Sequence, residues 1–271
     1  MTRRRTIAIT ALAASAALAL AGCASSTTPE SEAPESGADY GLIEAGVLTV
    51  CSDVPYPPFE DFDENSESGF TGFDIDLLTA IAEKLDLTIS VQDVGFDALQ
   101  SGTTLVAGQC DIGASAMTIT DERKANIDFS DPYYDSLQSL MVASGSGIES
   151  IDDLAGKTVG VQQGTTGEAY ATENTPDGTE IVRLPSDGEL WPAIQAGNID
   201  AILQDLPVNV EHVRADDSYT IVEEYDTEES YGFAFAKDEK TELLEAVNGA
   251  LADLRDDGTY QEIYDSYFAA E

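Results

Sequence analysis

The amino-acid sequence predicts an α/β protein made of two lobes with mainly parallel sheets. Two halves of the chain repeat one pattern, in which an apolar strand runs into a polar turn and a later helix ends in Ala-Gly before a second apolar strand. The strands are residues 47–51 and 110–114 in the first half, and 157–161 and 199–203 in the second. Strands that alternate with helices in this way predict βαβ units, and therefore a parallel sheet in each lobe.

Helices are predicted where apolar residues recur with the helical period. Residues 73–85 place leucine and isoleucine side chains on one face of such a helix. Residues 186–189, Ser-Asp-Gly-Glu, match a capping box before an apolar stretch, and Pro192 should bend that helix or delay its start. Residues 243–254 and 260–268 are predicted to form two further helices, separated by Asp-Gly.

The N-terminal segment predicts an exported protein. Three arginines at positions 3–5 precede an apolar run over residues 7–20, which is too short for a membrane span. The segment ends in Leu-Ala-Gly-Cys and resembles the lipobox of bacterial lipoproteins, whose cysteine becomes the lipidated first residue of the mature chain. The alternative is an ordinary signal peptide with an incidental cysteine. We predict a signal peptide over residues 1–22 and lipidation of Cys23.

The segment after the signal peptide is predicted to be a tether. Residues 23–40 are rich in Ser, Thr, Pro, Glu and Gly and show no apolar periodicity. Such a segment cannot bury a core, so we expect it to be a disordered linker to the lipid anchor. The residues that follow suffice for one large domain or for two lobes of ordinary size.

The charge of the chain excludes some classes of partner. The formal net charge is −40 at pH 7, and removal of the arginines in the signal peptide would make it more negative. Such a surface repels nucleic acids and anionic lipids, so we expect neither as a partner. The charge favours solubility and tolerance of salt, and it also concentrates cationic solutes near the protein.

Two cysteines besides Cys23 leave the question of a disulfide open. Cys51 and Cys110 do not form a metal-type pair, and His212 is the one histidine of the chain, so we expect no metal. Export permits a disulfide. The two cysteines lie at different heights in neighbouring predicted strands, however, and that offset would place their Cα atoms too far apart.

Motifs of common catalytic sites are not found in the sequence. It contains no nucleophile elbow, no P-loop and no His-Glu-x-x-His, and a single histidine leaves little scope for a catalytic triad. We therefore expect a protein that is not an enzyme and that needs no cofactor.

Two segments and one aspartate suit a small zwitterion instead. Residues 115–123 follow an apolar strand and residues 163–167 precede a helix, so both place hydrogen-bond donors at the carboxyl edge of a sheet. Arg123 could bind a carboxylate and Asp205 an ammonium group, since a buried charge needs a partner. Taken singly, Arg123 also suits a surface ion pair, Thr120 a helix cap and Asp205 a turn.

Several motifs in order resemble one family, the polar amino-acid solute-binding proteins of ABC importers. The resemblance runs from about residue 48 to residue 268 and therefore covers nearly all of the predicted globular part. The motifs that carry it are Asp53-Val54-Pro55-Tyr56-Pro57-Pro58-Phe59-Glu60, Gly72-Phe73-Asp74-Ile75-Asp76-Leu77, Met117-Thr118-Ile119-Thr120-Asp121-Glu122-Arg123, Ile127-Asp128-Phe129-Ser130-Asp131-Pro132-Tyr133-Tyr134 and Asp257-Gly258-Thr259-Tyr260.

The resemblance implies the α/β fold of type II periplasmic binding proteins, with two lobes joined by a two-segment hinge. Lobe 1 would then comprise residues 41–132 and 232–271, and lobe 2 would comprise residues 138–226. The hinge segments would lie near residues 133–137 and 227–231. Closure of the lobes would bury the ligand between them.

The resemblance also implies which residues contact the ligand. Arg123, Thr118 and Thr166 should bind its carboxylate, while Asp205 and the backbone of Ala116 should bind its ammonium group. The other expected contacts surround the ligand side chain and are Tyr56 and Phe96, with Asp53 nearby, and Gln162 and Gln204 at positions that vary with the ligand. The alternative for the two aromatic residues is plain core packing.

The family pattern and the residues together predict a ligand and a location. Asp53 at the side-chain end favours arginine, lysine or histidine before glutamine, and disfavours an acidic ligand. We expect a monomer, anchored by lipid to the outer face of the membrane, that delivers its ligand to an ABC permease. The rivals are an enzyme of the cyclohexadienyl-dehydratase type and the binding subunit of a membrane sensor. Near residues 101–104 the chain is two residues longer than the pattern of glutamine-binding members. This leaves open where the helix after Phe96 starts and in which direction Phe96 points.

Overall fold

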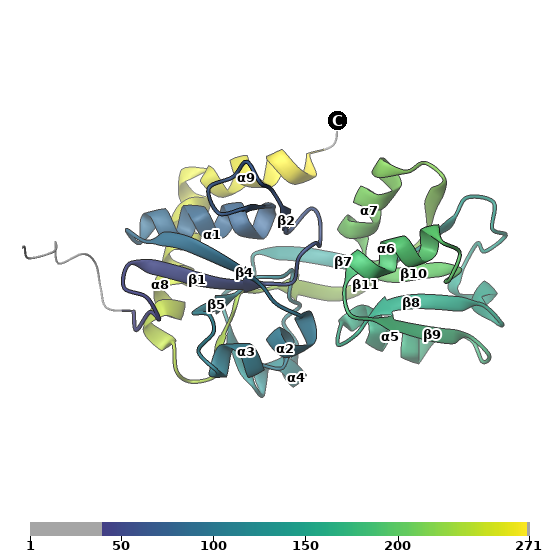
Figure 1. The fold of residues 1–271 in the computed structure, drawn as a ribbon, viewed down its shortest axis with the longest axis horizontal. Coiled ribbons are helices and arrows are strands. Elements are labelled where there is room, and N and C mark those ends of the chain that lie inside the picture. The colour runs from purple at the N-terminus through teal and green to yellow at the C-terminus, as the bar shows by residue number, and fades with distance from the viewer. Residues whose placement is uncertain (1–39, 270–271) are drawn as a thin grey trace, which may run out of the picture. The chain divides into compact units, whose positions relative to one another are not determined.

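A computed structural model describes residues 40–269, and its elements are labelled in Figure 1. The predicted signal peptide, the tether up to residue 39 and Cys23 lie outside the described residues. Two five-stranded sheets, each with helices on both faces, form two α/β lobes. In the described part of the chain, no helix is both long enough and apolar enough to cross a membrane.

The sheet of lobe 1 combines parallel and antiparallel strands. Its order is β4 (Thr88–Asp93), β1 (Val47–Ser52), β5 (Ile112–Gly113), β12 (Ala234–Ala236) and β6 (Ile127–Phe129). Strand β1 pairs in parallel with β4 and β5, whereas β12 is antiparallel to β5 and β6. A hairpin of β2 (Asp61–Phe62) and β3 (Phe70–Thr71) lies outside this sheet.

The sheet of lobe 2 has the same mixture. Its order is β11 (Tyr219–Tyr231), β7 (Tyr134–Ala143), β10 (Ala201–Asp205), β8 (Thr158–Gln162) and β9 (Glu180–Leu184). Strand β8 is parallel to β10 and β9, whereas β7 is antiparallel to β10 and β11. The prediction of mainly parallel sheets was therefore wrong, because half of the pairings in each sheet are antiparallel.

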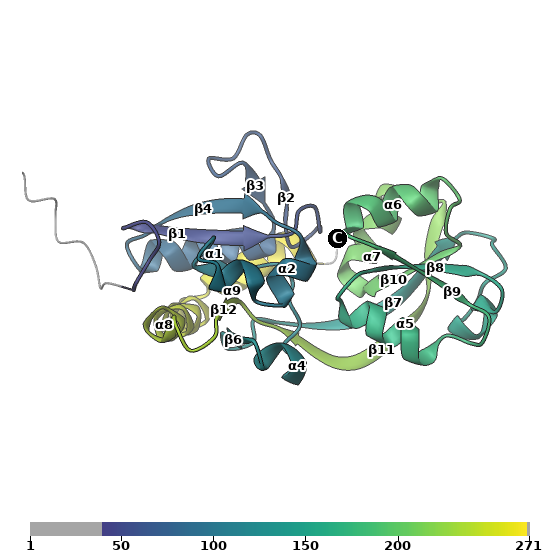
Figure 2. The same ribbon diagram turned by 60° about the horizontal axis from the view of Figure 1, so that its bottom comes forward.

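The antiparallel pairings arise where the chain passes from one lobe to the other. The long strands β7 and β11 run between the lobes, and β12 begins three residues after β11 ends (Figure 2). Strands β7 and β12 enter their sheets after short connections from β6 and β11, without the crossover helix that a parallel neighbour would need, whereas β11 follows α7 (Leu206–Ala215). Along this crossing, Tyr134 pairs with Tyr231 and Ser136 with Glu229.

Helices cover both faces of the lobe 1 sheet, as the alternation of side chains along β1 requires. Leu48 and Val50 pack into one core with α1 (Phe73–Lys84), α8 (Thr241–Asp257) and α9 (Thr259–Phe268). Cys51 points to the other face, where it packs with α2 (Phe96–Gln100) and α3 (Thr103–Val106). Predicted and observed helices agree within a few residues for α1, α8 and α9.

The helix after Phe96 is split into two short pieces. Gly102 lies between α2 and α3 with φ of 79°, a left-handed conformation that suits glycine. A Cβ atom added there would come within 2.7 Å of the Ile127 side chain. The extra residues of this segment therefore form a turn, and Phe96 is the first residue of its helix.

The lobe 2 sheet is also covered on both faces. Leu140 and Leu203 pack with α5 (Thr166–Asn174) on one face, and Met141 and Ile202 pack with α6 (Asp187–Gln195) on the other. The 3-10 helix Ile151–Leu154, α7 (Leu206–Ala215) and the short α4 (Asp121–Lys124) of lobe 1 complete the described elements.

Two local predictions for the α6 region need correction. Helix α6 begins at Asp187 and continues past Pro192, so this proline does not delay its start. Ser186 is the N-cap residue, but its side chain makes no capping hydrogen bond and instead donates to the carboxylate of Glu189. The capping box predicted for residues 186–189 is therefore not formed.

Cys51 and Cys110 form a disulfide, with their Cα atoms 5.7 Å apart. The offset between strands, which argued against this bond, does not apply because Cys110 is not part of a strand. Strand β5 starts two residues later, at Ile112, and Cys110 lies in the turn that leads into it. The disulfide joins residues 59 positions apart and packs in the core beneath α2 and α3.

Candidate functional site

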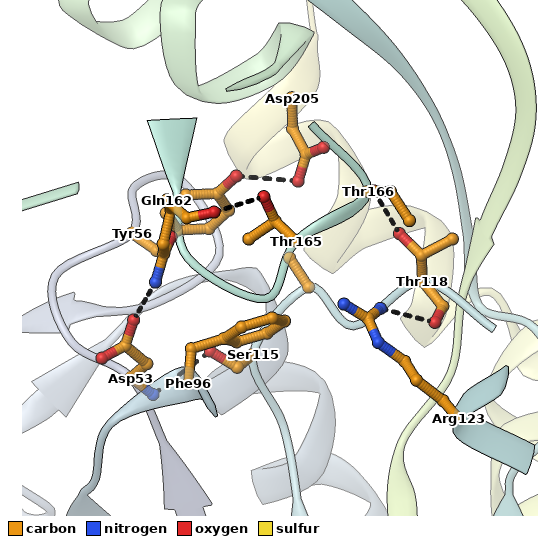
Figure 3. A pocket seen from close by; sticks show the side chains of 11 residues that line it. Asp53, Tyr56, Phe96, Ser115, Thr118, Arg123, Gln162, Thr165, Thr166 and Asp205 are labelled. Carbon is orange, nitrogen blue, oxygen red and sulfur yellow. Dashed lines mark hydrogen bonds between the residues drawn. The ribbon is translucent and has the colours of Figure 1, made fainter. Parts of the chain in front are cut away.

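A cavity of about 280 Å³, including its opening, lies between the two lobes (Figure 3). The residues that line it come from both lobes and are Asp53, Tyr56, Phe96, Ser115, Ala116, Thr118, Arg123, Gln162, Thr165, Thr166 and Asp205. The structure thus brings together every residue expected to contact a ligand except Gln204.

Strand ends place these side chains at the cavity. In lobe 1, Asp53 directly follows β1 and the segment from Ser115 to Thr118 follows β5. In lobe 2, Gln162 ends β8, Asp205 ends β10 and Thr166 begins α5. Since β1, β5, β8 and β10 run with their carboxyl ends toward the cavity, the site has the position typical of ligand sites in open α/β sheets.

Arg123 is the positive charge that lines the cavity. It is 5% exposed, and its guanidinium donates from Nη1 to the carbonyl of Thr118 at 2.8 Å and from Nη2 to the carbonyl of Gly164 at 3.0 Å. The guanidinium also lies 5.2 Å from the ring centre of Phe96. Burial lowers the pKa of Arg123 to about 10, partly offset by nearby carboxylates, so it remains protonated at neutral pH.

Asp205 provides a buried carboxylate from lobe 2. The hydroxyl of Tyr56 donates to its Oδ2 at 2.8 Å, and the amide of Gln138 donates to its Oδ1. Burial and the neighbouring Glu229 together raise the pKa of Asp205 to about 6, while these hydrogen bonds oppose the shift. An ammonium group placed here would offset the unfavourable burial of this carboxylate.

Asp53 provides a second buried carboxyl group, which comes from lobe 1. Its Oδ2 accepts a hydrogen bond of 2.6 Å from Gln162 Nε2, which reaches across the cavity. Its backbone N–H donates to Ser115 Oγ at 3.1 Å. Burial raises the pKa of Asp53 to about 7, although the bond from Gln162 lowers it, so the carboxyl group is poised to ionise near neutral pH.

Gln204 does not line the cavity. It precedes Asp205 in β10, and neighbouring side chains of a strand point to opposite faces of the sheet. The amide of Gln204 donates to Asp187 Oδ1 at 3.0 Å and to Asn209 Oδ1 at 3.1 Å, both beneath α6 and α7. The prediction that Gln204 contacts the ligand is therefore not supported by its position.

Four residues at or behind the cavity were not among the expected contacts. Ser115 and Thr165 line it, and both lie in the donor segments that the sequence indicated. Gln138 and Glu229 lie behind it on the crossing strands, where they contact Asp205, Thr118 and Thr166. One feature of the sequence could have indicated Gln138 and Glu229. They lie at or next to the predicted crossing segments, which must pass close to any site between the lobes.

The arrangement can bind a zwitterion. A guanidinium and two threonine hydroxyls offer partners for a carboxylate, and a buried carboxylate nearby offers one for an ammonium group. The Ala116 backbone, with φ of 43°, turns at the cavity wall while its N–H donates to Asp74 Oδ2 at 2.9 Å. Within residues 40–269, no group of His, Cys, Asp and Glu is placed to hold a metal ion.

The family model and the similar proteins all indicate the same family. Residues 48–270 match the model of the bacterial extracellular solute-binding proteins, family 3. The chain is 31% identical to a putative ABC transporter arginine-binding protein 2 of Escherichia coli K12, over 86% of this chain and 95% of the relative. It is 32% identical to the L-cystine-binding protein TcyJ of the same strain, over 88% and 90%.

A solved structure of an ancestral arginine-binding protein bound to arginine has the same fold. Its TM-score is 0.76 at 37% identity, over 83% of this chain and 99% of that one. The family match covers both lobes and every residue that lines the cavity. The chain belongs to the family 3 extracellular solute-binding proteins of bacteria.

Proposed function

We propose that this protein binds an L-amino acid outside the cytoplasm and delivers it to the permease of an ABC importer. The observation that carries the proposal is the presence of Arg123 from lobe 1 and Asp205 from lobe 2 at one cavity between the lobes. These two charges match the two charged groups that every free α-amino acid presents. The amino-acid-binding relatives support the same function.

The proposed binding mode follows from the position of each group. The ligand carboxylate binds Arg123 and the hydroxyls of Thr118 and Thr166. The ammonium group binds Asp205 and the carbonyl of Ala116. The side chain extends between Tyr56 and Phe96 toward Asp53 and Gln162. We further propose that the crossing segments of β7 and β11 act as the hinge on which the lobes close.

The charges around the cavity favour a cationic side chain. Asp53 lies away from Arg123, at the end of the cavity that the side chain would reach (Figure 3). An ionised Asp53 attracts a guanidinium or ammonium group and repels a second carboxylate. We therefore place arginine, lysine and histidine before glutamine, and we exclude glutamate and aspartate as the main ligands.

An enzyme on the same fold is the second candidate. The one observation that favours it is the pKa of Asp53, raised to about 7 by burial, because a general acid needs such a value. The same shift also suits a carboxylate that awaits a cationic partner. Mass spectrometry after incubation separates the two, since a binding protein returns its amino acid unchanged.

A panel of all twenty L-amino acids in a thermal-shift assay tests the proposed function. A ligand at a hundred times its dissociation constant adds about 2.7 kcal/mol to the free energy of unfolding, so the true ligand should raise the melting temperature by several degrees. We expect the largest shift from arginine, lysine or histidine. A largest shift from glutamate or aspartate would contradict the assignment of Asp53.

Arg123→Ala and Asp205→Ala should each weaken binding by roughly thirtyfold or more. Removing one partner of a buried charge pair costs about 2–5 kcal/mol of affinity, because the other charge is left without its counterpart. Calorimetry on the folded variants measures this. The matched control is Arg214→Ala on the outer surface of α7, where Arg214 pairs only with Glu211. Binding within threefold of the parent by both site variants would place the pocket elsewhere.

The affinity for a cationic ligand should rise with pH and level off above about pH 7. The free protein holds a proton on Asp53 below this pH because burial raises its pKa to about 7, and a cationic side chain favours the ionised form. Below this pKa, binding must release that proton, which lowers the affinity. In Asp53→Asn the remaining rise should centre near pH 6, the pKa of Asp205. Calorimetry across this range, with exposed Asp217→Asn as the control, measures both curves.

We also propose that Cys23 carries the lipid anchor and that the protein acts as a monomer at the outer face of the membrane. The support is the Leu-Ala-Gly-Cys end of the signal segment. Cys23→Ser should release the mature protein into the medium or leave it unprocessed, as immunoblots of membrane and medium fractions would show. Unchanged partition into the membrane would exclude lipidation at this cysteine.

A further inference from the structure

Glu229 reaches the site through an irregularity in crossing strand β11. Tyr225 pairs with Gln138 and Glu229 pairs with Ser136, so three residues of β11 lie opposite one residue of β7. Within this bulge, Glu228 adopts φ of 56°, which is uncommon for a residue other than glycine. Bulges of this kind change the direction of a side chain. The result is that Glu229 is 7% exposed, whereas Glu228 points to solvent.

One oxygen of Glu229 binds both threonines of the cavity. Its Oε2 accepts from Thr118 Oγ1 of lobe 1 and from Thr166 Oγ1 of lobe 2, each at 2.8 Å. Its Oε1 accepts from Thr227 Oγ1, also at 2.8 Å. The carboxylate of Glu229 thus lies behind the two hydroxyls to which the proposed function assigns the ligand carboxylate.

A count of protons shows that the two carboxylates compete. A threonine hydroxyl has one proton to donate, and its two lone pairs only accept. Both protons are donated to Glu229, so neither threonine can also donate to a ligand carboxylate. A ligand carboxylate can take these protons only by displacing Glu229, and otherwise the threonine oxygens face the cavity as acceptors.

The charged groups near Glu229 also disfavour a ligand carboxylate. Asp205 and Glu229 both lie close to the amide of Gln138, which donates to Asp205 and reaches Glu229 Oε2 at 3.3 Å. The cation of this group, Arg123, donates to backbone carbonyls. Glu229 is a third carboxylate beside Asp53 and Asp205. It strengthens the attraction of the cavity for positive groups of a ligand and weakens its attraction for negative ones.

We propose that Glu229 is a specificity-determining residue, which competes with the ligand carboxylate for the hydroxyl protons of Thr118 and Thr166. Its effect is to shift recognition toward the positive groups of the ligand. The inference rests on the proposed function, since it concerns which part of an amino acid the site selects.

The test compares L-arginine with agmatine, the same molecule without its carboxylate, in Glu229→Gln. A hydrogen bond to an ionised acceptor contributes more than one to a neutral amide, by an amount worth about tenfold in affinity. The variant should therefore raise the ratio of the agmatine to the arginine dissociation constant by about tenfold in calorimetry. Glu224→Gln, exposed on the same strand, should leave this ratio unchanged. A purely structural role for Glu229 would change both dissociation constants alike.

Thr166→Val supplies a second test, and its measurement in the parent does not depend on the folding of Glu229→Gln. In the parent, the Thr166 hydroxyl donates to Glu229 before binding and to the ligand carboxylate after it. Loss of this hydroxyl should therefore change arginine affinity by less than about threefold. In Glu229→Gln it should cost about tenfold for arginine and nothing for agmatine. A large loss in the parent would overturn the competition.

The outcomes separate this inference from the proposed function. If the parent binds no amino acid or amine, both fall. If the parent binds arginine and the ratio in Glu229→Gln equals that of Glu224→Gln, the proposed function stands and the role of Glu229 is rejected.

Discussion

The burial of charge between the lobes is the constraint on which the site depends. Arg123, Asp205 and Asp53 are each less than a tenth exposed, and removal of a charge from water is unfavourable unless polar partners replace it. For Arg123 the partners are two carbonyls, one from each lobe. For Asp205 and Asp53 they are Tyr56 and Gln162, which reach across from the opposite lobe. The atoms to which the proposed function assigns the ligand therefore also join the lobes, so a ligand would have to replace these contacts as it enters.

The crossing strands link this chemistry to the architecture. Strands β7 and β11 belong to the lobe 2 sheet, yet their ends pass beside the cavity and pair with each other up to Tyr134 and Tyr231. They contribute Gln138 and Glu229, whose side chains contact groups from both lobes. A rotation of one lobe about these strands would change the contacts of Glu229 with Thr118 of lobe 1 and Thr166 of lobe 2. The hydrogen bonds at the crossing are thus sensitive to the distance between the lobes.

Much of the fold could be predicted because its signals are local. Apolar strands, Ala-Gly helix ends and the Asp-Gly break between the C-terminal helices lie within short windows of sequence, and the structure has them within a few residues of where they were expected. The antiparallel pairings of β7 and β12 could not be predicted in this way, because they depend on where a strand enters its sheet. The disulfide was left open for a similar reason, since a turn before β5 sets the position of Cys110. Gln204 shows the limit within a single strand: it is next to Asp205, but the alternation of faces directs it beneath α6.

The excess of carboxylates over cations at the cavity makes proton binding part of ligand recognition. With burial raising the pKa of Asp53 to about 7 and that of Asp205 to about 6, protons occupy these groups below about pH 7 and pH 6 respectively when no other cation does. A ligand with two positive groups can exchange for both protons, and a neutral amino acid can exchange for only one. A glutamate ligand would add a further carboxylate beside Asp53 and Asp205, whose own ionisation is already unfavourable. The proposed selectivity for cationic amino acids would follow from the cost of ionising buried carboxylates, and it should weaken as the pH falls and protons compete with the ligand.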